Sequence, residues 1–281
     1  MTFSRFDPLV SIIIPVKDSS KTIEEALLSL CLQTYKNIQT IIIDDGCRDD
    51  TVVLAKKIMS SKNLVILSHP NKKNYGPCIS RCCGLARAEG DYICFLDGDD
   101  MFQPDKLEYQ LQVMQNNSNC ILSHTDVNII GDVTNKATLE SYFNTAPPLL
   151  RYCYSALPDF LINNHICNSS VMIRRSAIQY FVALKLKYQF EDWLQWIILS
   201  HYGYFFHIPV KLTNYRMSNE SFSGRADCIE LCLAKIEILA ALINAKQPLV
   251  STQFIYDKLY ESIKNLSYFQ QKFDYNMDDQ E

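Results

Sequence analysis

Short, continuously apolar segments alternate with amphipathic segments over the first 125 residues, and this alternation is the feature that most constrains the fold. The segment Val10–Pro15 reads VSIIIP, a β-branched run typical of a strand buried on both faces. Between residues 23 and 31, apolar side chains recur at helical spacing. Further strands are predicted at Ile38–Ile43, Leu64–Leu67, Asp91–Leu96 and Cys120–His124, and further helices at Asp50–Ser61, Pro77–Ala88 and Pro104–Asn116. Strands and helices that alternate through short loops predict an α/β fold with a parallel central sheet.

After Thr125 the alternation weakens. The polar, proline-containing segment Gly131–Leu150 is predicted as a loop, and the acidic tail Asn276–Glu281 as a frayed end. The remaining predicted strands are Asn168–Arg174, Tyr204–His207 and Lys211–Arg216, and the remaining predicted helices are Phe190–His201, Ala226–Ala245 and Ser251–Asn265. The chain after residue 226 is therefore expected to be mainly helical.

Composition excludes several classes of partner. The 281 residues carry 27 basic and 31 acidic side chains, a formal net charge of -4, so the basic excess of a nucleic-acid binder is missing. The longest apolar runs have the length of strands, far below the roughly 20 residues of a membrane-spanning helix. Met1–Pro8 has no apolar core, so no secretory signal is expected. Eleven cysteines without a C-x-x-C pair indicate reduced thiols in a cytoplasmic protein.

Carboxylates concentrate where predicted strands end. Asp97, Asp99 and Asp100 directly follow the apolar run that ends at Leu96, and Asp44-Asp45-Gly46 follows another strand. The carboxyl ends of parallel strands are where such sheets bind ligands. Three neighbouring carboxylates repel one another unless a cation offsets their charge, and their oxygens suit Mg²⁺ or Mn²⁺ holding a diphosphate. On this segment alone, a solvated acidic turn explains the pattern equally well.

Two further segments contain candidate functional residues. In the first, Gly76 precedes a predicted helix start, which suits a bound anion, and Arg81 lies about one turn into that helix. In the second, Glu191 and Asp192 begin a helix that also holds both tryptophans of the chain, at 193 and 196. This arrangement fits a carboxylate base beside an aromatic platform for a sugar, and it also fits a capped helix with tryptophans in the core.

Four segments together resemble glycosyltransferase family 2, which has the GT-A fold. They read VSIIIPV, QTYKNIQTIIIDDGCRDDT, NYGPCISRCCGLARAEGDYICFLDGDD and EDWLQW. The resemblance is close from Leu9 to about Met114 and returns at Ser169–Arg175, Glu191–Gly203 and Tyr215–Ser223. Their order and spacing are much more specific than any single motif.

The resemblance implies a mixed, mostly parallel sheet flanked by helices and a helical C-terminal region. It implies three regions: a nucleotide-sugar-binding α/β subdomain at 1–125, an acceptor-binding subdomain at 126–225 and a helical region at 226–281. The implied activity is inverting transfer of a sugar from a nucleotide-diphosphate donor, with UDP the expected nucleotide, to an acceptor hydroxyl in glycan or polysaccharide biosynthesis.

Residue roles follow from the same resemblance. Asp192 is expected to be the general base, with Glu191 and Trp193 contacting the acceptor or the sugar. Asp97 and Asp99 match a D-x-D motif and are expected to bind Mn²⁺ or Mg²⁺. The residues expected around the donor nucleotide are Pro15, Val16, Asp45, Gly76, Arg81, Asp97 and Gly98.

The chain departs from the family pattern at three points. Lys17-Asp18 stands where an aromatic-Asn pair is common. Cys82 replaces the usual Asn after the arginine, and Ser218 stands where a histidine is common. A non-catalytic nucleotide-sugar-binding relative and a nucleotidyltransferase are the alternatives. The second usually has a Gly-rich basic loop after the first strand, which residues 15–20 do not have.

The expected partners are a nucleotide-sugar donor and a glycan or lipid-linked glycan acceptor, without nucleic acid and without a transmembrane span. The sequence leaves open whether the chain forms oligomers or touches the inner face of a membrane. Apolar residues recur at helical spacing between 231 and 242, and core packing is the commoner explanation for such a stripe.

Overall fold

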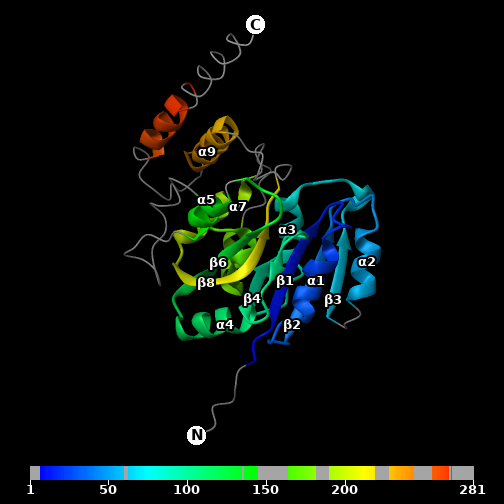
Figure 1. Ribbon diagram of the computed structural model, residues 1–281. Helices are drawn as coiled ribbons and strands as arrows, with labels where there is room; N and C mark the ends of the chain where they lie inside the picture. The colour runs from blue at the N-terminus through cyan, green and yellow to red at the C-terminus, as the bar shows by residue number, and fades with distance from the viewer. Residues whose placement is uncertain are drawn as a thin grey trace.

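A computed structural model describes residues 7–59, 63–134, 136–144, 164–181, 190–218, 228–243, 255–265 and 267. Over these ranges the chain forms a mixed α/β structure around one curved eight-stranded sheet (Figure 1). The predicted tail at 276–281 lies outside the described residues, as do residues 135 and 145–150 of the predicted loop.

The sheet has the strand order β3-β2-β1-β4-β7-β6-β8-β5. The four strands β1, β2, β3 and β4 run parallel, and β6 runs parallel to β8, whereas β7 and β5 pair antiparallel with their neighbours. The bounds are β1 Val10–Val16, β2 Ile38–Asp44, β3 Leu64–Ser68, β4 Tyr92–Phe95, β5 Met101–Phe102, β6 Cys120–Ile130, β7 Met172–Arg174 and β8 Tyr204–Arg216. The mixed, mostly parallel sheet expected from the sequence is thus confirmed.

Helices cover both faces of the sheet. They are α1 Ile23–Cys31, α2 Thr51–Ile58, α3 Pro77–Leu85, α4 Lys106–Asn116, α5 Lys136–Phe143, α7 Glu191–Ser200 and α9 Cys228–Ile243, and residues 255–265 are also helical. Short 3-10 helices lie at Pro70–Lys72, Asn168–Ser170 and Arg175–Tyr180. Figure 1 shows α9 and the helix 255–265 beyond α5 and α7, at the end of the molecule away from α4.

Alternate side chains of β1 enter two different cores, because successive residues of a strand point to opposite faces. Val10, Ile12 and Ile14 pack with apolar residues of α1, α2 and α4. Ile13 packs on the other face, in a cluster that includes residues of α3, α7 and α9. All four of these β1 side chains are fully buried, which accounts for the continuous apolar run in the sequence.

Register places the acidic strand ends side by side. Val16 at the end of β1 pairs with Asp44 at the end of β2, and Ile13 pairs with Phe95 at the end of β4. The turns that follow β1, β2 and β4 therefore lie along one edge of the sheet, as parallel pairing requires.

Three predicted elements differ from the structure. Residues 136–143, predicted as loop, form α5, and its Glu140 carboxylate accepts from the Ile129 amide of β6. The strand predicted at 168–174 is a 3-10 turn followed by three strand residues, because Asn168–Ser170 leave the sheet to line the site. The two strands predicted at 204–207 and 211–216 form one strand, β8, which stays paired to β6 across irregular register.

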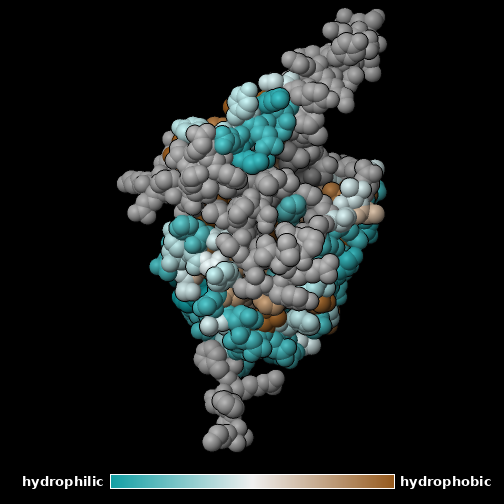
Figure 2. Space-filling view, turned by 90° about the vertical axis from the view of Figure 1, so that its left-hand side faces the viewer, coloured by the Kyte–Doolittle hydropathy of each residue, from teal (hydrophilic) through white to brown (hydrophobic). Residues whose placement is uncertain are grey.

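Within the described ranges, every helix is too short or too polar to cross a bilayer. Figure 2 shows one face of the molecule, on which the described surface is mostly hydrophilic, including the upper end where α9 and the helix 255–265 lie. A small hydrophobic area lies in the lower half of the same face.

Candidate active site at the carboxyl edge of the sheet

The turn after β4 packs tightly against the residues that follow β1. Thr22 donates from Oγ1 to the Gly98 carbonyl at 2.8 Å. A Cβ at position 98 would lie 3.1 Å from Ser19 Oγ and 3.2 Å from Val16 Cγ1, so only glycine fits without displacing a neighbour. Val16 and Gly98, predicted from distant motifs, are therefore in direct contact, and they hold Asp97 and Asp99 at the sheet edge.

The acidic turn carries more negative charge than its neighbours offset. Burial, reinforced by Asp97, raises the pKa of Asp99 to about 6, while Arg216 opposes the shift. Asp100 is fully buried, and burial followed by the charges of Asp99 and Asp97 raises its pKa well above the usual range. Its Oδ1 accepts from the Arg216 amide at 2.8 Å, whereas its Oδ2 finds no hydrogen-bond partner among the described residues.

These features fit a divalent cation. Uncompensated carboxylates with an unpartnered buried oxygen offer the hard oxygen ligands that Mg²⁺ and Mn²⁺ prefer. Asp18, Cys47 and Asp49 form another group whose donor atoms lie within 4.8 Å of one another. The carboxylates of Asp18 and Asp49 there accept from backbone amides, which explains that group as loop structure.

Arg81 connects the acidic turn to α7. Its guanidinium donates to Asp97 Oδ1 and to Glu191 Oε1, each at 2.6 Å. Asn168, with its amide oxygen turned toward the guanidinium, accepts from Arg81 at 3.1 Å. Burial disfavours the cation, but Asp97 and Glu191 outweigh it and raise the pKa of Arg81. Arg81 was expected to hold the donor nucleotide. In the structure, two carboxylates occupy its donors, so any ligand contact would be shared with them.

Asp192 lies in the first turn of α7, one residue after the Arg81 contact. Its Oδ1 accepts from the Trp193 amide at 2.7 Å, and its Oδ2 accepts from Asn164 at 3.3 Å. Burial, and then the charge of Glu191, raises the pKa of Asp192 to about 7. A carboxylate with a pKa near the working pH suits general base catalysis, since it can both accept and release a proton.

Asp45 holds the loop that precedes α3. Its Oδ1 accepts from the Tyr75 amide at 2.6 Å and its Oδ2 from the Gly76 amide at 2.9 Å. Gly76 has a φ of +86°, a conformation that favours glycine. The contact of Asp45 with a base stays a prediction, while its contact with the Gly76 loop is a structural role that the sequence did not reveal.

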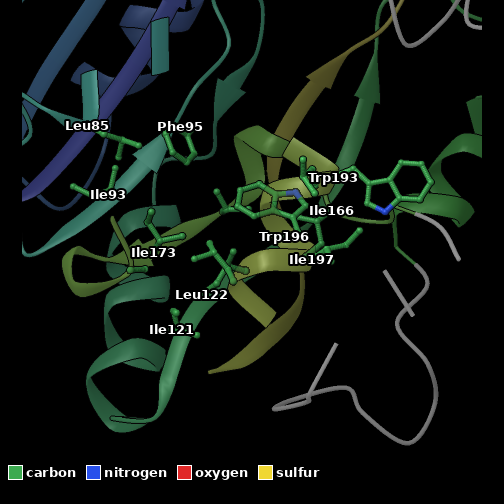
Figure 3. Packing of buried hydrophobic residues seen from close by; sticks show 14 of the residues in the cluster. Leu85, Ile93, Phe95, Ile121, Leu122, Ile166, Ile173, Trp193, Trp196 and Ile197 are labelled. Atoms are coloured by element: carbon green, nitrogen blue, oxygen red, sulfur yellow. The ribbon is translucent and has the colours of Figure 1, made fainter. Parts of the chain in front are cut away.

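A cavity of about 600 Å³ opens beside these residues. Arg81, Asp97, Glu191, Asp192 and Trp193 all line it. Figure 3 shows that the Trp193 indole points away from the other labelled side chains, whereas the Trp196 indole lies among them. Trp196 is 1% exposed and belongs to the core. Both tryptophans therefore belong to the same buried cluster, and Trp193 in addition lines the cavity.

Sequence reasoning missed Asn164, Asn168 and Lys235, all of which line this cavity. Asn164 lies in an irregular segment, Asn168 begins a short 3-10 turn, and Lys235 sits within an apolar helical stripe. Isolated polar residues of this kind carry no spacing signal, so only the fold could identify them. The predicted donor residues Pro15, Val16 and Asp45 lie along the neighbouring strand ends and not among the described residues lining the cavity.

Comparison with curated proteins gives a consistent set of relatives. The chain is 38% identical over 156 residues to an uncharacterized glycosyltransferase of Rickettsia felis, covering 54% of this chain and 25% of that one. It is 30% identical over 225 residues to the putative teichuronic acid biosynthesis glycosyltransferase TuaG of Bacillus subtilis, covering 79% and 84% of the two chains. It is also 41% identical over 109 residues to the Escherichia coli UDP-Glc:alpha-D-GlcNAc-diphosphoundecaprenol beta-1,3-glucosyltransferase WfaP, covering 38% and 41%.

The chain spans about a quarter to a half of the length of the first curated relatives that it matches. Two solved structures share the fold. Staphylococcus aureus TarS 1-349 in complex with UDP-GlcNAc aligns with a TM-score of 0.66 at 16% identity, covering 92% of this chain and 72% of that one. The mannosyltransferase PcManGT from Pyrobaculum calidifontis, in complex with GDP-Man and Mn²⁺, aligns with a TM-score of 0.64 at 13% identity, covering 94% and 75%.

The model of the family described as Glycosyl transferase family 2 matches residues 11–181, which is more than half of the chain. This match includes the acidic turn and the Arg81 helix, and the fold agrees with the GT-A arrangement expected from the sequence. The chain therefore belongs to glycosyl transferase family 2.

Proposed function

We propose that this protein is an inverting glycosyltransferase that moves a sugar from a nucleotide-diphosphate donor to an acceptor hydroxyl in polysaccharide or glycan biosynthesis. The observation that carries the proposal is that Asp97 and Asp192 line one cavity and are connected through Arg81 and Glu191. A cation-binding acid and a carboxylate base on the same cavity are what a single displacement at a sugar carbon needs.

Asp192 acts as the base in this proposal. Its carboxylate removes the proton from the acceptor hydroxyl, whose oxygen forms a bond to the anomeric carbon. The bond from that carbon to the diphosphate oxygen breaks, and the electron pair leaves with the nucleoside diphosphate. Attack opposite the leaving group inverts the anomeric centre. The hydrogen bond from Asn164 fixes Asp192 Oδ2, and the burial that raises the pKa of Asp192 makes it a better proton acceptor.

Asp97 and Asp99 would hold Mn²⁺ or Mg²⁺. When bound, the ion supplies positive charge that offsets the negative charge of the leaving diphosphate. The protein's own contribution is a closely packed turn, since a side chain at position 98 would meet Ser19 and Val16. The Mn²⁺ bound in PcManGT, which has the same fold, supports this assignment.

The donor is proposed to be a UDP-sugar whose nucleotide lies against Pro15, Val16 and Asp45. TarS binds UDP-GlcNAc and WfaP is named for UDP-Glc, and both resemble this chain. The acceptor is proposed to be a glycan, either free or linked to a lipid as in the printed name of WfaP. A cytoplasmic location, with or without a peripheral membrane contact, is part of the same proposal.

A donor-binding and turnover experiment tests the function. A panel of UDP- and GDP-sugars is added with Mn²⁺, and the melting temperature is followed, because a donor that binds only the folded state raises it. We expect one UDP-sugar to raise the melting temperature, the shift to disappear with EDTA, and added Mn²⁺ or Mg²⁺ to restore it. Transfer to acceptors is then measured with that donor. Full activity in EDTA would contradict the metal assignment.

The alternatives give different results in the same experiment. A non-catalytic relative would show the shift in melting temperature but neither transfer nor hydrolysis of the donor. A nucleotidyltransferase would consume a sugar phosphate and a nucleoside triphosphate and release pyrophosphate. The base at Asp192, set beside a cavity with aromatic walls, favours sugar transfer.

A further inference from the structure

The cavity beside Asp192 extends from the sheet to the C-terminal helices. Cys232 and Lys235 of α9 line it, together with Ser262 and Asn265 of the helix 255–265. None of the residues proposed to contact the nucleotide base belongs to its described lining. This end of the cavity therefore lies beyond the reacting centre, on the side where an acceptor would enter.

Charge is distributed unequally along the cavity. At the sheet end, the charge of Arg81 is offset by Asp97 and Glu191, each at 2.6 Å. At the helical end, Lys235 is the cationic side chain, and no carboxylate among the described residues lies within ion-pair distance of its ammonium. The neighbouring acid Glu261 forms an ion pair with Lys258 at 2.8 Å. Lys235 is thus a cation that faces the cavity without a close counter-ion in the described structure.

Partial burial makes this arrangement costly. Desolvation lowers the pKa of Lys235, and the more distant charge of Glu261 offsets only part of that effect. An anionic ligand would compensate for the lost hydration, since hydrogen bonds between ions are stronger than those between neutral groups. A lysine that only covers apolar surface would instead extend its ammonium into bulk water.

Apolar and aromatic side chains line the same cavity as Lys235 and the acids. They are Leu139, Phe143, Phe190, Trp193, Tyr215 and Met217. Such surfaces pack against the C–H faces of sugar rings, while polar groups at either end fix the orientation of the ligand. The acceptor hydroxyl would then meet Asp192 at one end, and a charged substituent would meet Lys235 at the other.

We propose that Lys235 binds a negatively charged group, a phosphate or a carboxylate, on the acceptor, and so selects anionic over neutral acceptors. This inference rests on the proposed function, because it names the class of acceptor for the same site. Phosphate and carboxylate share the chemistry that Lys235 recognises, namely anionic oxygens that accept from an ammonium. A phosphate would come from a sugar phosphate or a diphosphate-linked saccharide, and a carboxylate from a uronic acid.

Three probes with one scaffold separate these sources. They are methyl glucoside, methyl glucuronide and methyl glucoside 6-phosphate. Binding of each to the full chain is followed by tryptophan fluorescence, because Trp193 lines the cavity, and is confirmed by calorimetry. We expect at least one anionic probe to bind about tenfold more tightly than the neutral one, which corresponds to one hydrogen bond between charged groups. Which anionic probe binds more tightly identifies the source of the charge.

The variants Lys235→Gln and Lys235→Arg test the residue. Lys235→Gln is expected to bring the ratio of anionic to neutral affinity close to one, and Lys235→Arg to keep most of the preference. Lys264→Gln removes a positive charge from an exposed position on the helix 255–265 and should leave the ratio unchanged. A ratio that is equal in wild type and Lys235→Gln, or that falls as much in Lys264→Gln, would overturn the proposal.

A measurement of donor binding distinguishes failure of the proposed anion subsite from failure of the proposed function. Each variant is also titrated with the UDP-sugar and Mn²⁺ by melting temperature, which reports folding and the donor site together. If the donor binds and sugar is transferred while acceptor preference is independent of Lys235, only the anion subsite is wrong. If no nucleotide sugar binds to the wild type, the proposed function itself fails.

Discussion

Arg81 of α3 donates to Glu191 of α7 at 2.6 Å across 110 positions of sequence. The same guanidinium donates to Asp97, so one side chain connects the acidic turn after β4 with the helix that carries Asp192. Because this cation lies between two mostly buried acids, it sets the distance between the predicted metal ligands and the predicted base. Five testable predictions follow from this arrangement and from buried contacts elsewhere in the fold.

Removing the Arg81 cation should destabilise the protein. Arg81→Met leaves Asp97 and Glu191 facing each other without their shared donor, and breaking a buried ion pair costs about 3–5 kcal/mol. The lower end is expected, since the Asp97 side chain is 31% exposed. Urea unfolding measures the change. Arg87→Met, at an exposed site next to the same helix, should unfold like the wild type. Equal stability of the two variants would contradict the connecting role of Arg81.

Loss of the carboxylate at Asp192 should slow transfer without loss of the donor. General base assistance contributes about 10²–10⁴-fold, so Asp192→Asn should lower kcat by that factor. The donor should still raise the melting temperature of the variant. Asp132→Asn, which neutralises an exposed acid, should keep wild-type kcat. If Asp192→Asn transferred sugar at the wild-type rate, another residue would have to be the base.

The Asp192 carboxylate also predicts how the transfer rate of the wild type depends on pH. The pKa of Asp192 is raised to about 7, and only the deprotonated carboxylate accepts a proton. The rate should therefore rise with pH up to about 7 and level off above it. In Asp192→Asn the residual rate should lose this step. A wild-type rate that is constant between pH 5 and 7 would not agree with a base of raised pKa.

The buried Lys106 ammonium should lower the free energy of unfolding at neutral pH. Its side chain is fully buried, its ammonium donates to Gln110 at 2.6 Å and lies 4.1 Å from the Phe102 ring, and burial lowers its pKa to about 8. The folded state therefore binds fewer protons than the unfolded state between about pH 8 and 10.5, so stability rises with pH across that window. The lowered pKa of Lys106 corresponds to a loss of about 3 kcal/mol in the free energy of unfolding at pH 7.

Lys106→Met removes this penalty along with the contacts to Gln110 and Phe102. We expect a net gain of about 1 kcal/mol at pH 7 and the loss of the rise in stability between pH 8 and 10. Urea unfolding at pH 7 and pH 9.5 measures both effects. A variant that unfolds more readily at pH 7 would show that the contacts of Lys106 outweigh its desolvation.

Close packing of α3 on the sheet predicts a further stability change. A Cβ at Gly84 would lie 2.5 Å from Ile13 Cγ2 and 2.9 Å from Ile43 Cδ1, and both side chains are fully buried. Gly84→Ala should destabilise the protein by about 1–3 kcal/mol through overpacking. Helix propensity alone would stabilise the variant by about 1 kcal/mol, because alanine favours a helix more than glycine does. A net gain in stability would therefore contradict the close packing of Gly84 on Ile13 and Ile43. Thermal unfolding decides between them.

Much of the fold could be predicted from local patterns. The runs at Val10–Val16 and Ile38–Asp44 are almost continuously apolar because both faces of a parallel strand are covered, and this signal is present in the sequence itself. The acidic turn at 97–100 was equally visible in the sequence, although its functional interpretation depended on the resemblance of four segments together and not on this segment alone.

Other features depended on contacts between distant segments. Residues 136–143 are mostly polar, and their helix is held to β6 by hydrogen bonds from Ile129 to Glu140 and from Val127 to Asn144 beyond its end. Nothing local in that segment indicates these bonds. That Trp193 lines this cavity while Trp196 does not likewise depends on what faces each side of α7.

The sequence by itself determined most of the strands and helices, the acidic strand ends and the family. Periodicity and motif spacing are local, and they are read without knowing which segments meet. Only the tertiary structure decided that Arg81 is shared between Asp97 and Glu191, that Asn164 fixes Asp192, and that Lys235 faces the same cavity. These relationships join residues from separate elements, and their energies arise from burial and charge that exist only after the chain has folded.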